Sequence, residues 1–536
     1  SFTYDIFGRL TEESRPDGTR AVYQYDGYNV VLTTYLNDGT VRKKIKKTNP
    51  MGWLIETEDN GGASVVYDYY SSGNIKSAKI LGNENTVINV EYDNRGNKKR
   101  LSDPNGGVLC YEYDAADNLV KMIYPENNVT TYSYNAVGQT VRRVDKDVHT
   151  GKEIVTEWIY EDNDGEIGLL KKIICGDNQV ITYNYDELLR VTSVDEMIDG
   201  EMYSTSFTYD EVGRKLEETF PSGLTIKNVY SNSGYCRSII DVDREKVLWT
   251  ANKVDSFGNI VEFETANGCV SEFFYDDLNN RLLSILTKKG DFELQNLVYS
   301  YDGNGNLTGR SKYTGTKVSE EFEYDKYDRL TKIRRNGMTT GIMQYDVLGN
   351  INSKSVDGKD IYFEAEYDTE KPNAIVKAKL GEVDIEGINH TITYTMFDKV
   401  DKIISGDNTI AFQYGFDYER CKVTSVVDGK SLEKVYVGGC EYVTENNKTT
   451  VYTYIQSPAG VFAVEVLTPE GDRGFYFIYK DHLGSWNIIT DENGNKIQEL
   501  SFDAWGNLRN ADTWSGTYNG DMLCDRGFTG HEHLKD

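Results

Sequence analysis

The stretch "FTYDIFGRL" at residues 2–10 returns in altered form as "FTYDEVGRKL" at 207–216 and "FFYDDLNNRLL" at 273–283. An active site is normally assembled once, whereas a pattern that recurs along a chain is usually a structural unit. Five of the steps between successive copies are 21 residues long. Aligned on its tyrosine, the pattern occurs at Tyr4, Tyr25, Tyr69, Tyr92, Tyr113, Tyr134, Tyr185, Tyr209, Tyr230, Tyr275, Tyr301, Tyr324 and Tyr345.

A second turn signal separates successive copies of the motif. Asn-Gly and Asp-Gly pairs supply the positive φ angles that two-residue hairpin turns need, and β-branched and aromatic residues flank them. Each repeat is therefore predicted to hold two short strands and two turns. These second turns include "PDGT" (16–19), "NDGT" (37–40), "PNGG" (104–107) and "PSGL" (221–224), and weaker motif copies at 49–54, 254–260, 394–400 and 414–420 extend the array to about residue 430.

The residues of the motif have separate structural roles. Side chains alternate along a strand, so Tyr23 and Tyr25 are predicted on one face, where their rings can stack on equivalent rings of neighbouring strands. Asp26 is predicted to accept hydrogen bonds from backbone N–H groups of the following turn. Gly8 is predicted to take a turn conformation that is closed to other residues, and Leu10 to start the next strand pointing inward.

Composition favours an all-β protein. The 536 residues include 40 tyrosines and 49 glycines but only 8 prolines, which is typical of twisted strands and tight turns. This length exceeds what one compact core normally supports. A repeat array escapes that limit because each unit contacts only its neighbours.

Charge and hydropathy exclude several classes of partner. The net charge of −28 would repel nucleic acid and anionic lipid, and no apolar run approaches the roughly 20 residues of a membrane span. The seven cysteines are scattered and form neither a CxxC pair nor a disulfide framework. The chain starts inside a repeat, which we interpret as a sign of a fragment or a processed product.

The repeat resembles a known family. Y-D-x-x-G-R-L motifs at intervals near 21 resemble the YD repeats of the Rhs (rearrangement hotspot) family, which includes bacterial polymorphic toxins, wall-associated proteins, the C component of insecticidal Tc toxins and animal teneurins. The resemblance covers about residues 1–430. Its clearest carriers here are Tyr4, Asp5 and Gly8; Tyr92, Asp93 and Gly96; Tyr209, Asp210 and Gly213; and Tyr345, Asp346 and Gly349.

The stretches 479–509 and 527–534 resemble the Rhs-associated core that closes the repeat region, so residues 431–536 are predicted to form that core segment. Asn487 stands where the family often has arginine, and Ala504-Trp505 replaces the common Pro-Phe before Gly506. These departures leave the subfamily open. The residues that match the family's D-H-L-G-S and F-T-G-H-E are Asp481, His482, Leu483, Gly484, Ser485, Phe528, Thr529, Gly530, His531 and Glu532.

The resemblance implies a long spiral of antiparallel β-hairpins that forms a hollow shell or part of one. A curved sheet with both faces solvated suits a mean hydropathy of −0.56. In toxin members the shell encloses a C-terminal polypeptide, and aspartates beyond the F-T-G-H-E segment cut the backbone to free it. Such aspartates would lie beyond Asp536.

The resemblance therefore implies a non-enzymatic container of an exported bacterial toxin, secreted or associated with the cell surface. Its expected partners are a C-terminal effector and, further, secretion machinery or an N-terminal plug region. The alternative is a cell-surface adhesion or glycan-binding protein, whose partner would be a glycan or a cell-surface receptor. The effector, the export route and the target cell are not encoded in this chain.

The residues that could be catalytic or bind a metal are better explained as parts of the fold. His482, His531 and His533 could ligate zinc, but no fourth ligand is apparent. The stretches 302–307 and 162–168 carry alternating oxygen ligands yet lack the glutamate of an EF-hand. Ser485 lacks a nucleophile elbow. We expect no enzymatic activity, no metal and no cofactor.

Overall fold

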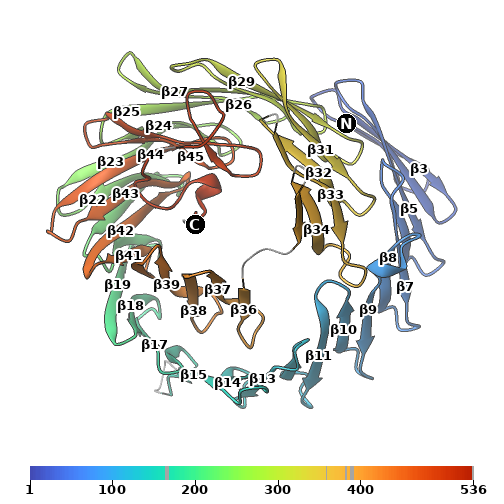
Figure 1. The fold of residues 1–536 in the computed structure, drawn as a ribbon, viewed down its shortest axis with the longest axis horizontal. Helices are drawn as coiled ribbons and strands as arrows, with labels where there is room; N and C mark the ends of the chain where they lie inside the picture. The colour runs from blue at the N-terminus through green and yellow to red at the C-terminus, as the bar shows by residue number, and fades with distance from the viewer. Residues whose placement is uncertain (163–167, 358, 381–382, 387–390, 519, 534–536) are drawn as a thin grey trace. The chain divides into compact units, whose positions relative to one another are not determined.

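The computed structural model describes residues 1–162, 168–357, 359–380, 383–386, 391–518 and 520–533. Its regular structure is almost entirely β-strand, which confirms the predicted all-β class (Figure 1). Two short 3-10 turns, Glu84–Thr86 and Phe528–Gly530, are the helical elements of these residues. Among the described residues no helix has the length and apolar character of a membrane span.

The described residues of the first half of the chain contain twenty-four strands. They are β1 (Phe2–Tyr4), β2 (Leu10–Ser14), β3 (Arg20–Asp26), β4 (Asn29–Tyr35), β5 (Val41–Thr48), β6 (Leu54–Glu58), β7 (Ser64–Tyr69), β8 (Ile75–Ile80), β9 (Ile88–Tyr92), β10 (Lys98–Asp103), β11 (Gly107–Tyr113), β12 (Leu119–Ile123), β13 (Val129–Tyr134), β14 (Thr140–Lys146), β15 (Glu153–Tyr160), β16 (Leu170–Cys175), β17 (Gln179–Tyr185), β18 (Val191–Ile198), β19 (Glu201–Tyr209), β20 (Lys215–Thr219), β21 (Thr225–Tyr230), β22 (Cys236–Asp241), β23 (Lys246–Val254) and β24 (Ile260–Thr265).

The second half adds a further series. These strands are β25 (Cys269–Tyr275), β26 (Leu282–Lys289), β27 (Phe292–Tyr301), β28 (Leu307–Lys312), β29 (Val318–Tyr324), β30 (Leu330–Arg335), β31 (Met338–Tyr345), β32 (Ile351–Val356), β33 (Lys359–Tyr367), β34 (Ile375–Leu380), β35 (Val383–Glu386), β36 (Thr391–Tyr394), β37 (Val400–Ser405), β38 (Asn408–Tyr414), β39 (Arg420–Val427), β40 (Lys430–Val437), β41 (Cys440–Glu445), β42 (Lys448–Ser457), β43 (Gly460–Leu467), β44 (Arg473–Lys480), β45 (Trp486–Thr490), β46 (Lys496–Glu499), β47 (Ser501–Phe502) and β48 (Leu508–Arg509).

Within each sheet neighbouring strands pair antiparallel, and most motif tyrosines mark an irregularity in the pairing, whereas Tyr25 pairs with Val30 in regular register. The register shifts between Thr3 and Tyr4, between Ser133 and Tyr134, and again before the tyrosines of later repeats. A three-residue hairpin loop that ends in a left-handed residue produces this bulge, because one strand then carries an extra residue. The motif is therefore the end of one strand together with its turn.

The chain forms two compact units, each made of segments that are distant in sequence. Unit 1 comprises Ser1–Glu112, Phe274–Ser284 and Leu297–Ile388, and unit 2 comprises Tyr113–Phe273, Ile285–Asn296 and Asn389–Asp536. The predicted boundary near residue 430 concerns sequence motifs and stays a prediction.

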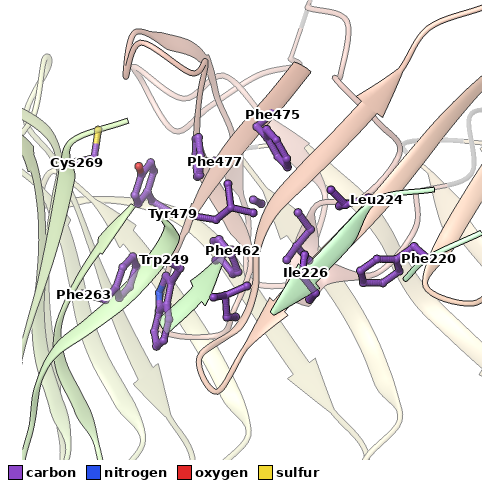
Figure 2. Packing of buried hydrophobic residues seen from close by; sticks show 14 of the residues in the cluster. Phe220, Leu224, Ile226, Trp249, Phe263, Cys269, Phe462, Phe475, Phe477 and Tyr479 are labelled. Carbon is purple, nitrogen blue, oxygen red and sulfur yellow. The ribbon is translucent and has the colours of Figure 1, made fainter. Parts of the chain in front are cut away.

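Unit 2 contains an apolar core between two layers of strands. Strands β21–β25 supply Trp249 and Phe263, and strands β42–β45 supply Phe462 and Tyr479 (Figure 2). The Trp249 side chain is fully buried, and its ring centroid lies 6.1 Å from that of Phe462. One face of this sheet is thus covered by other strands of unit 2, so the expectation of two solvated faces is wrong for β21–β25. Face-to-face packing of two sheets buries their apolar side chains together.

Candidate functional site

The motif turn is closed by its aspartate and its glycine. In the first repeat Gly8 N–H donates to the Asp5 carbonyl at 3.0 Å, and Asp5 N–H donates to the Arg9 carbonyl at 2.9 Å. The Asp5 carboxylate also accepts from the N–H groups of Phe7 and Arg9, at 2.9 and 3.0 Å. Gly8 has a φ of +76°, which a side chain would strain. This carboxylate satisfies backbone donors of its own turn.

The other motif copies named from sequence show the same turn. The carboxylates of Asp93, Asp210 and Asp346 each accept two backbone N–H bonds from residues two and four positions later. Asp26 differs, because it ends β3 and pairs with Asn29 across a two-residue turn. The prediction that Asp26 accepts hydrogen bonds from the backbone of its turn is therefore wrong, whereas Asp5 has that role in the turn of its own repeat.

The motif tyrosine links one repeat to the repeat before it. The Tyr25 hydroxyl donates to the Leu10 carbonyl at 2.8 Å, and the Arg9 guanidinium lies 4.2 Å from the centre of the Tyr25 ring. The predicted ring stack is replaced here by a cation–π contact. The same hydroxyl-to-carbonyl link joins Tyr69 to Leu54, Tyr134 to Leu119, Tyr185 to Leu170, Tyr209 to Val191, Tyr230 to Lys215, Tyr324 to Leu307 and Tyr345 to Leu330.

The D-H-L-G-S segment is another turn of this type. The Asp481 carboxylate accepts from the N–H groups of Leu483 and Ser485, at 2.9 and 2.8 Å, and Gly484 has a φ of +82°. Leu483 is half exposed at the turn apex. His482 lies in the same turn between Asp481 and Leu483, so this part of the predicted core segment has the turn geometry of the repeats.

The F-T-G-H-E segment packs directly on that turn. Thr529 N–H donates to the Ser485 hydroxyl at 3.1 Å, and Trp486 N–H donates to the Gly527 carbonyl at 3.0 Å. The structure thus brings together two motifs that lie more than 40 residues apart. Ser485 is buried and acts here as a hydrogen-bond acceptor.

Phe528 and the two histidines near the end of the described chain pack against apolar and polar neighbours. The Phe528 and Phe502 ring centroids lie 5.8 Å apart, and the His533 ring stacks on Phe502 at 5.4 Å. His533 Nε2 accepts from Phe528 N–H at 2.9 Å, and burial lowers the pKa of His533. His531 Nδ1 contacts the Thr529 hydroxyl.

No metal cluster joins these residues. The described ranges contain no group of three His, Cys, Asp or Glu side chains placed to hold a metal ion. The calcium-like stretch 302–307 forms a motif turn, since the Asp302 carboxylate accepts from Asn306 N–H at 2.8 Å. Most of 162–168 lies outside the described residues.

Glu532 is the centre of a buried ion network. Its carboxylate lies 2.6 Å from Lys434 Nζ, and it accepts from the Tyr436 hydroxyl at 2.7 Å. Lys434 also contacts Asp525 at 2.6 Å, and Arg420 lies 3.3 Å from Glu532. Burial opposes ionisation of Glu532, but the Lys434 ammonium overcomes it and lowers the Glu532 pKa. The network fastens the C-terminal segment to β39 and β40.

A second ion pair lies beside the first. Arg526 donates to the Glu441 carboxylate, and the Tyr454 hydroxyl donates to the same group at 2.7 Å. The Arg526 guanidinium also lies 4.8 Å from the centre of the Tyr454 ring. The charges of Arg526 and Glu441 therefore neutralise each other at a site that is largely shielded from solvent, as buried charges require.

The Arg526–Glu441 pair lines a cavity of about 720 Å³ within unit 2. Its wall includes Glu196 and Lys480, whose Nζ donates to the Ala459 carbonyl at 2.5 Å. Burial raises the pKa of Glu196 and lowers that of Lys480. Burial also raises the pKa of the Cys421 thiol to about 12, so this cysteine is a poor nucleophile. The cavity suits the binding of polar groups, and its strongest charges are committed to structural pairs.

Several residues of this site escape sequence reasoning. Lys434 and Glu441 belong to no motif and lie on the consecutive strands β40 and β41, whereas Lys480 directly precedes the D-H-L-G-S segment. Arg526 directly precedes the G-F-T-G-H-E segment, and its position beside that motif is the one signal that could have found it.

Comparison with known proteins identifies a family model and solved structures that are similar to this chain. A model of the protein family described as teneurin YD-shell matches residues 1–370. No curated protein matches the chain significantly.

Solved structures share the fold across nearly the whole chain. The crystal structure of TcdB2-TccC3-TEV aligns with a TM-score of 0.84 at 14% identity, covering 99% of this chain and 31% of that chain. TcdB2-TccC3 without its hypervariable C-terminal region aligns with a TM-score of 0.83 at 15% identity, with coverage of 99% and 31%. The Photorhabdus luminescens Tc holotoxin pore gives 0.80 at 14% identity, with coverage of 95% and 30%. This chain therefore spans about a third of the length of the chains that it matches.

Proposed function

Because this chain belongs to the teneurin YD-shell family, we propose that it is the non-enzymatic shell of an exported bacterial Rhs-type toxin, which encloses and helps deliver a C-terminal polypeptide. The observation that carries this proposal is the likeness of 99% of the chain to TcdB2-TccC3 structures. The proposed partner is the polypeptide that follows the core segment.

The comparisons support a shell that tolerates different C-terminal sequences. The fold is shared by the protein named TcdB2-TccC3-TEV and by TcdB2-TccC3 without its hypervariable C-terminal region. A container must keep its fold whatever it encloses. The two structures, named with different C-terminal sequences, align almost equally well with this chain, which fits that requirement. Secretion machinery or an N-terminal plug region would be further partners, and the protein would be secreted or associated with the cell surface.

The chain's own chemistry supports enclosure rather than catalysis. The motif aspartates, which the sequence repeats most often, accept backbone hydrogen bonds inside their turns. The carboxylates Glu441 and Glu532 hold cations of the core segment. Carboxyl groups used in this way stabilise strands and turns instead of transferring protons to a substrate.

The test compares two lengths of the protein. One is residues 1–536, and the other extends into the coding sequence that follows Asp536 in its gene. Both are treated with a broad-specificity protease, followed by mass spectrometry, and assayed for growth inhibition. We expect the longer protein to yield a protected downstream fragment that stays bound to the shell. The shorter protein should be neither toxic nor self-cleaving.

A packing variant sharpens this test. Trp249→Ala removes a fully buried ring from the core of unit 2 and should expose the downstream fragment to the protease. The matched control is Val247→Ala on the same strand, where the side chain is 46% exposed. Toxicity or cleavage of residues 1–536 alone would overturn the proposal, and so would a gene that continues into a wall anchor.

A further inference from the structure

One basic side chain of the unit 2 cavity has no anionic partner. The two arginines that line this cavity, Arg420 and Arg526, each meet a glutamate. Among the described residues no carboxylate lies within ion-pair distance of Lys480 Nζ, which donates instead to the uncharged Ala459 carbonyl. A backbone oxygen thus takes the place of a counter-ion, although the chain has 86 acidic residues.

Lys480 is held in this position by the strands around it. It is the last residue of β44 and pairs with the buried Trp486 on β45. Its backbone carbonyl accepts from the Gln295 side chain at 3.2 Å. Its Nζ lies beside the turn that joins β42 to β43, where a Cβ on Gly460 would lie only 2.8 Å from it. The missing side chain of this glycine therefore makes room for the amine.

These surroundings favour the neutral form of the amine. Burial disfavours the charged form of a lysine, and since no anion restores it here, the pKa of Lys480 is lowered. The neighbouring Asp481 carboxylate is used by its own turn. A neutral amine keeps its lone pair, which is what makes a buried lysine nucleophilic. The other charged groups that line the cavity are Glu196, Asp417, Glu419, Arg420, Glu441 and Arg526.

The cavity indicates which kind of carbonyl compound suits this amine. Its volume of about 720 Å³ is in the range of small-molecule sites, which run from about 300 to 1,000 Å³. Gln179, Gln456 and Thr529 add uncharged hydrogen-bonding groups to its wall, so the compound should be polar. Four carboxylates against two arginines disfavour an anion. A small hydroxyaldehyde meets all of these conditions.

We propose that Lys480 is a covalent attachment site for a small, neutral, polar aldehyde. The Nζ lone pair attacks the carbonyl carbon, and the π electrons of the C=O bond move to the oxygen, which gives a carbinolamine. The two amine protons then leave with that oxygen as water, and a C=N bond joins the ligand to Nζ. One aldehyde is consumed and one water is released, with no oxidation or reduction. The site is independent of the enclosing role, because the reacting amine belongs to no structural ion pair.

Reductive trapping in the full chain tests this site. The protein is incubated with glycolaldehyde and cyanoborohydride, which reduces the C=N bond, and adducts are located by peptide mass spectrometry. Lys430 is the internal comparison, because it is exposed and likewise has no recorded ion pair among the described residues. At about pH 7 the adduct should form about fivefold faster or more at Lys480, since the exposed amine is almost fully protonated. The difference should narrow at about pH 10.

The dependence on aldehyde concentration separates a binding site from an amine that is only reactive. The rate at Lys480 should saturate, because the aldehyde binds in the cavity before it reacts, whereas the rate at Lys430 should rise linearly. Lys480→Arg should abolish the first adduct, and the matched Lys430→Arg should leave it unchanged. Slower labelling of Lys480 than of Lys430 at neutral pH, or a linear rate at Lys480, would overturn the proposal. Both comparisons use the wild type, so neither depends on the folding of a variant.

Discussion

The Tyr25 hydroxyl donates a hydrogen bond to the carbonyl oxygen of Leu10, fifteen residues earlier, at 2.8 Å. Leu10 begins the strand that follows the previous motif, so this bond ties each strand end to the turn before it. Recurrence of the bond along the array explains why the repeat keeps a tyrosine where phenylalanine would fill the same space.

Removing this hydroxyl should loosen one repeat junction. We expect Tyr25→Phe to destabilise β2 and β3 by about 1 kcal/mol, the usual net value of such a bond. Hydrogen exchange of the backbone amides in the two strands measures the effect. The control is Tyr23→Phe on the same strand, because among the described residues the Tyr23 hydroxyl has no recorded hydrogen bond. Equal protection loss in both variants would contradict the role of the bond.

The motif aspartates should make the protein sensitive to acid. The Asn97 N–H is the main cause that holds the pKa of Asp93 below its usual value, and the Arg190 guanidinium does the same for Asp186. Because the folded pKa is lower than the unfolded one, the stabilisation is complete above the unfolded pKa and is lost as pH falls through the folded pKa. We expect the urea midpoint to fall steeply below about pH 4.

A variant that cannot titrate checks this explanation. Asp93→Asn combined with Asp186→Asn keeps an oxygen acceptor in each turn but removes the ionisation. Its urea midpoint should be lower than that of the wild type at neutral pH and should change less with acid. A pH profile parallel to that of the wild type would exclude these turns as the cause.

Leu189 occupies the motif position that is usually glycine. Its φ is +63°, a left-handed conformation that is strained for leucine. Its side chain is 45% exposed, so packing compensates for little of this strain. Leu189→Gly should therefore stabilise the protein by about 1 kcal/mol. Leu188→Gly is the control, because that neighbour is 72% exposed and its φ is not positive, so glycine there should destabilise slightly. Chemical denaturation distinguishes the two, and the reverse order would refute the strain argument.

Lys434 should be essential for the docking of the C-terminal segment. Its side chain is 5% exposed, and Lys434→Met would remove the buried cation that Asp525 and Glu532 share, at a cost of about 3 to 5 kcal/mol. Limited proteolysis should then cut within 524–533. In the control, Lys448→Met removes the exposed pair with Glu470 and should leave the stability almost unchanged, because solvent screens an exposed pair. Resistance of the Lys434 variant to cutting would contradict the fastening role.

Local chemistry made much of the fold predictable from sequence. The 21-residue period and the Asp-to-Gly spacing predicted strand ends and turns, and the structure shows Asp5 and Gly8 closing such a turn. These interactions span a few residues, so the chain's own order contains all their partners. Tyr25 was harder to interpret, because its partner Leu10 lies in the preceding hairpin and not on a neighbouring ring.

The sequence alone therefore determined the class, the period and the turn chemistry of this protein. Only the tertiary structure decided that Gly303 meets Asp38, that Lys434 meets Glu532, and that Lys480 lines a cavity. The physical reason is distance along the chain. A turn needs only its own residues, whereas the contact of Gly303 with Asp38 depends on the twist and bend accumulated over many strands, which no single repeat encodes.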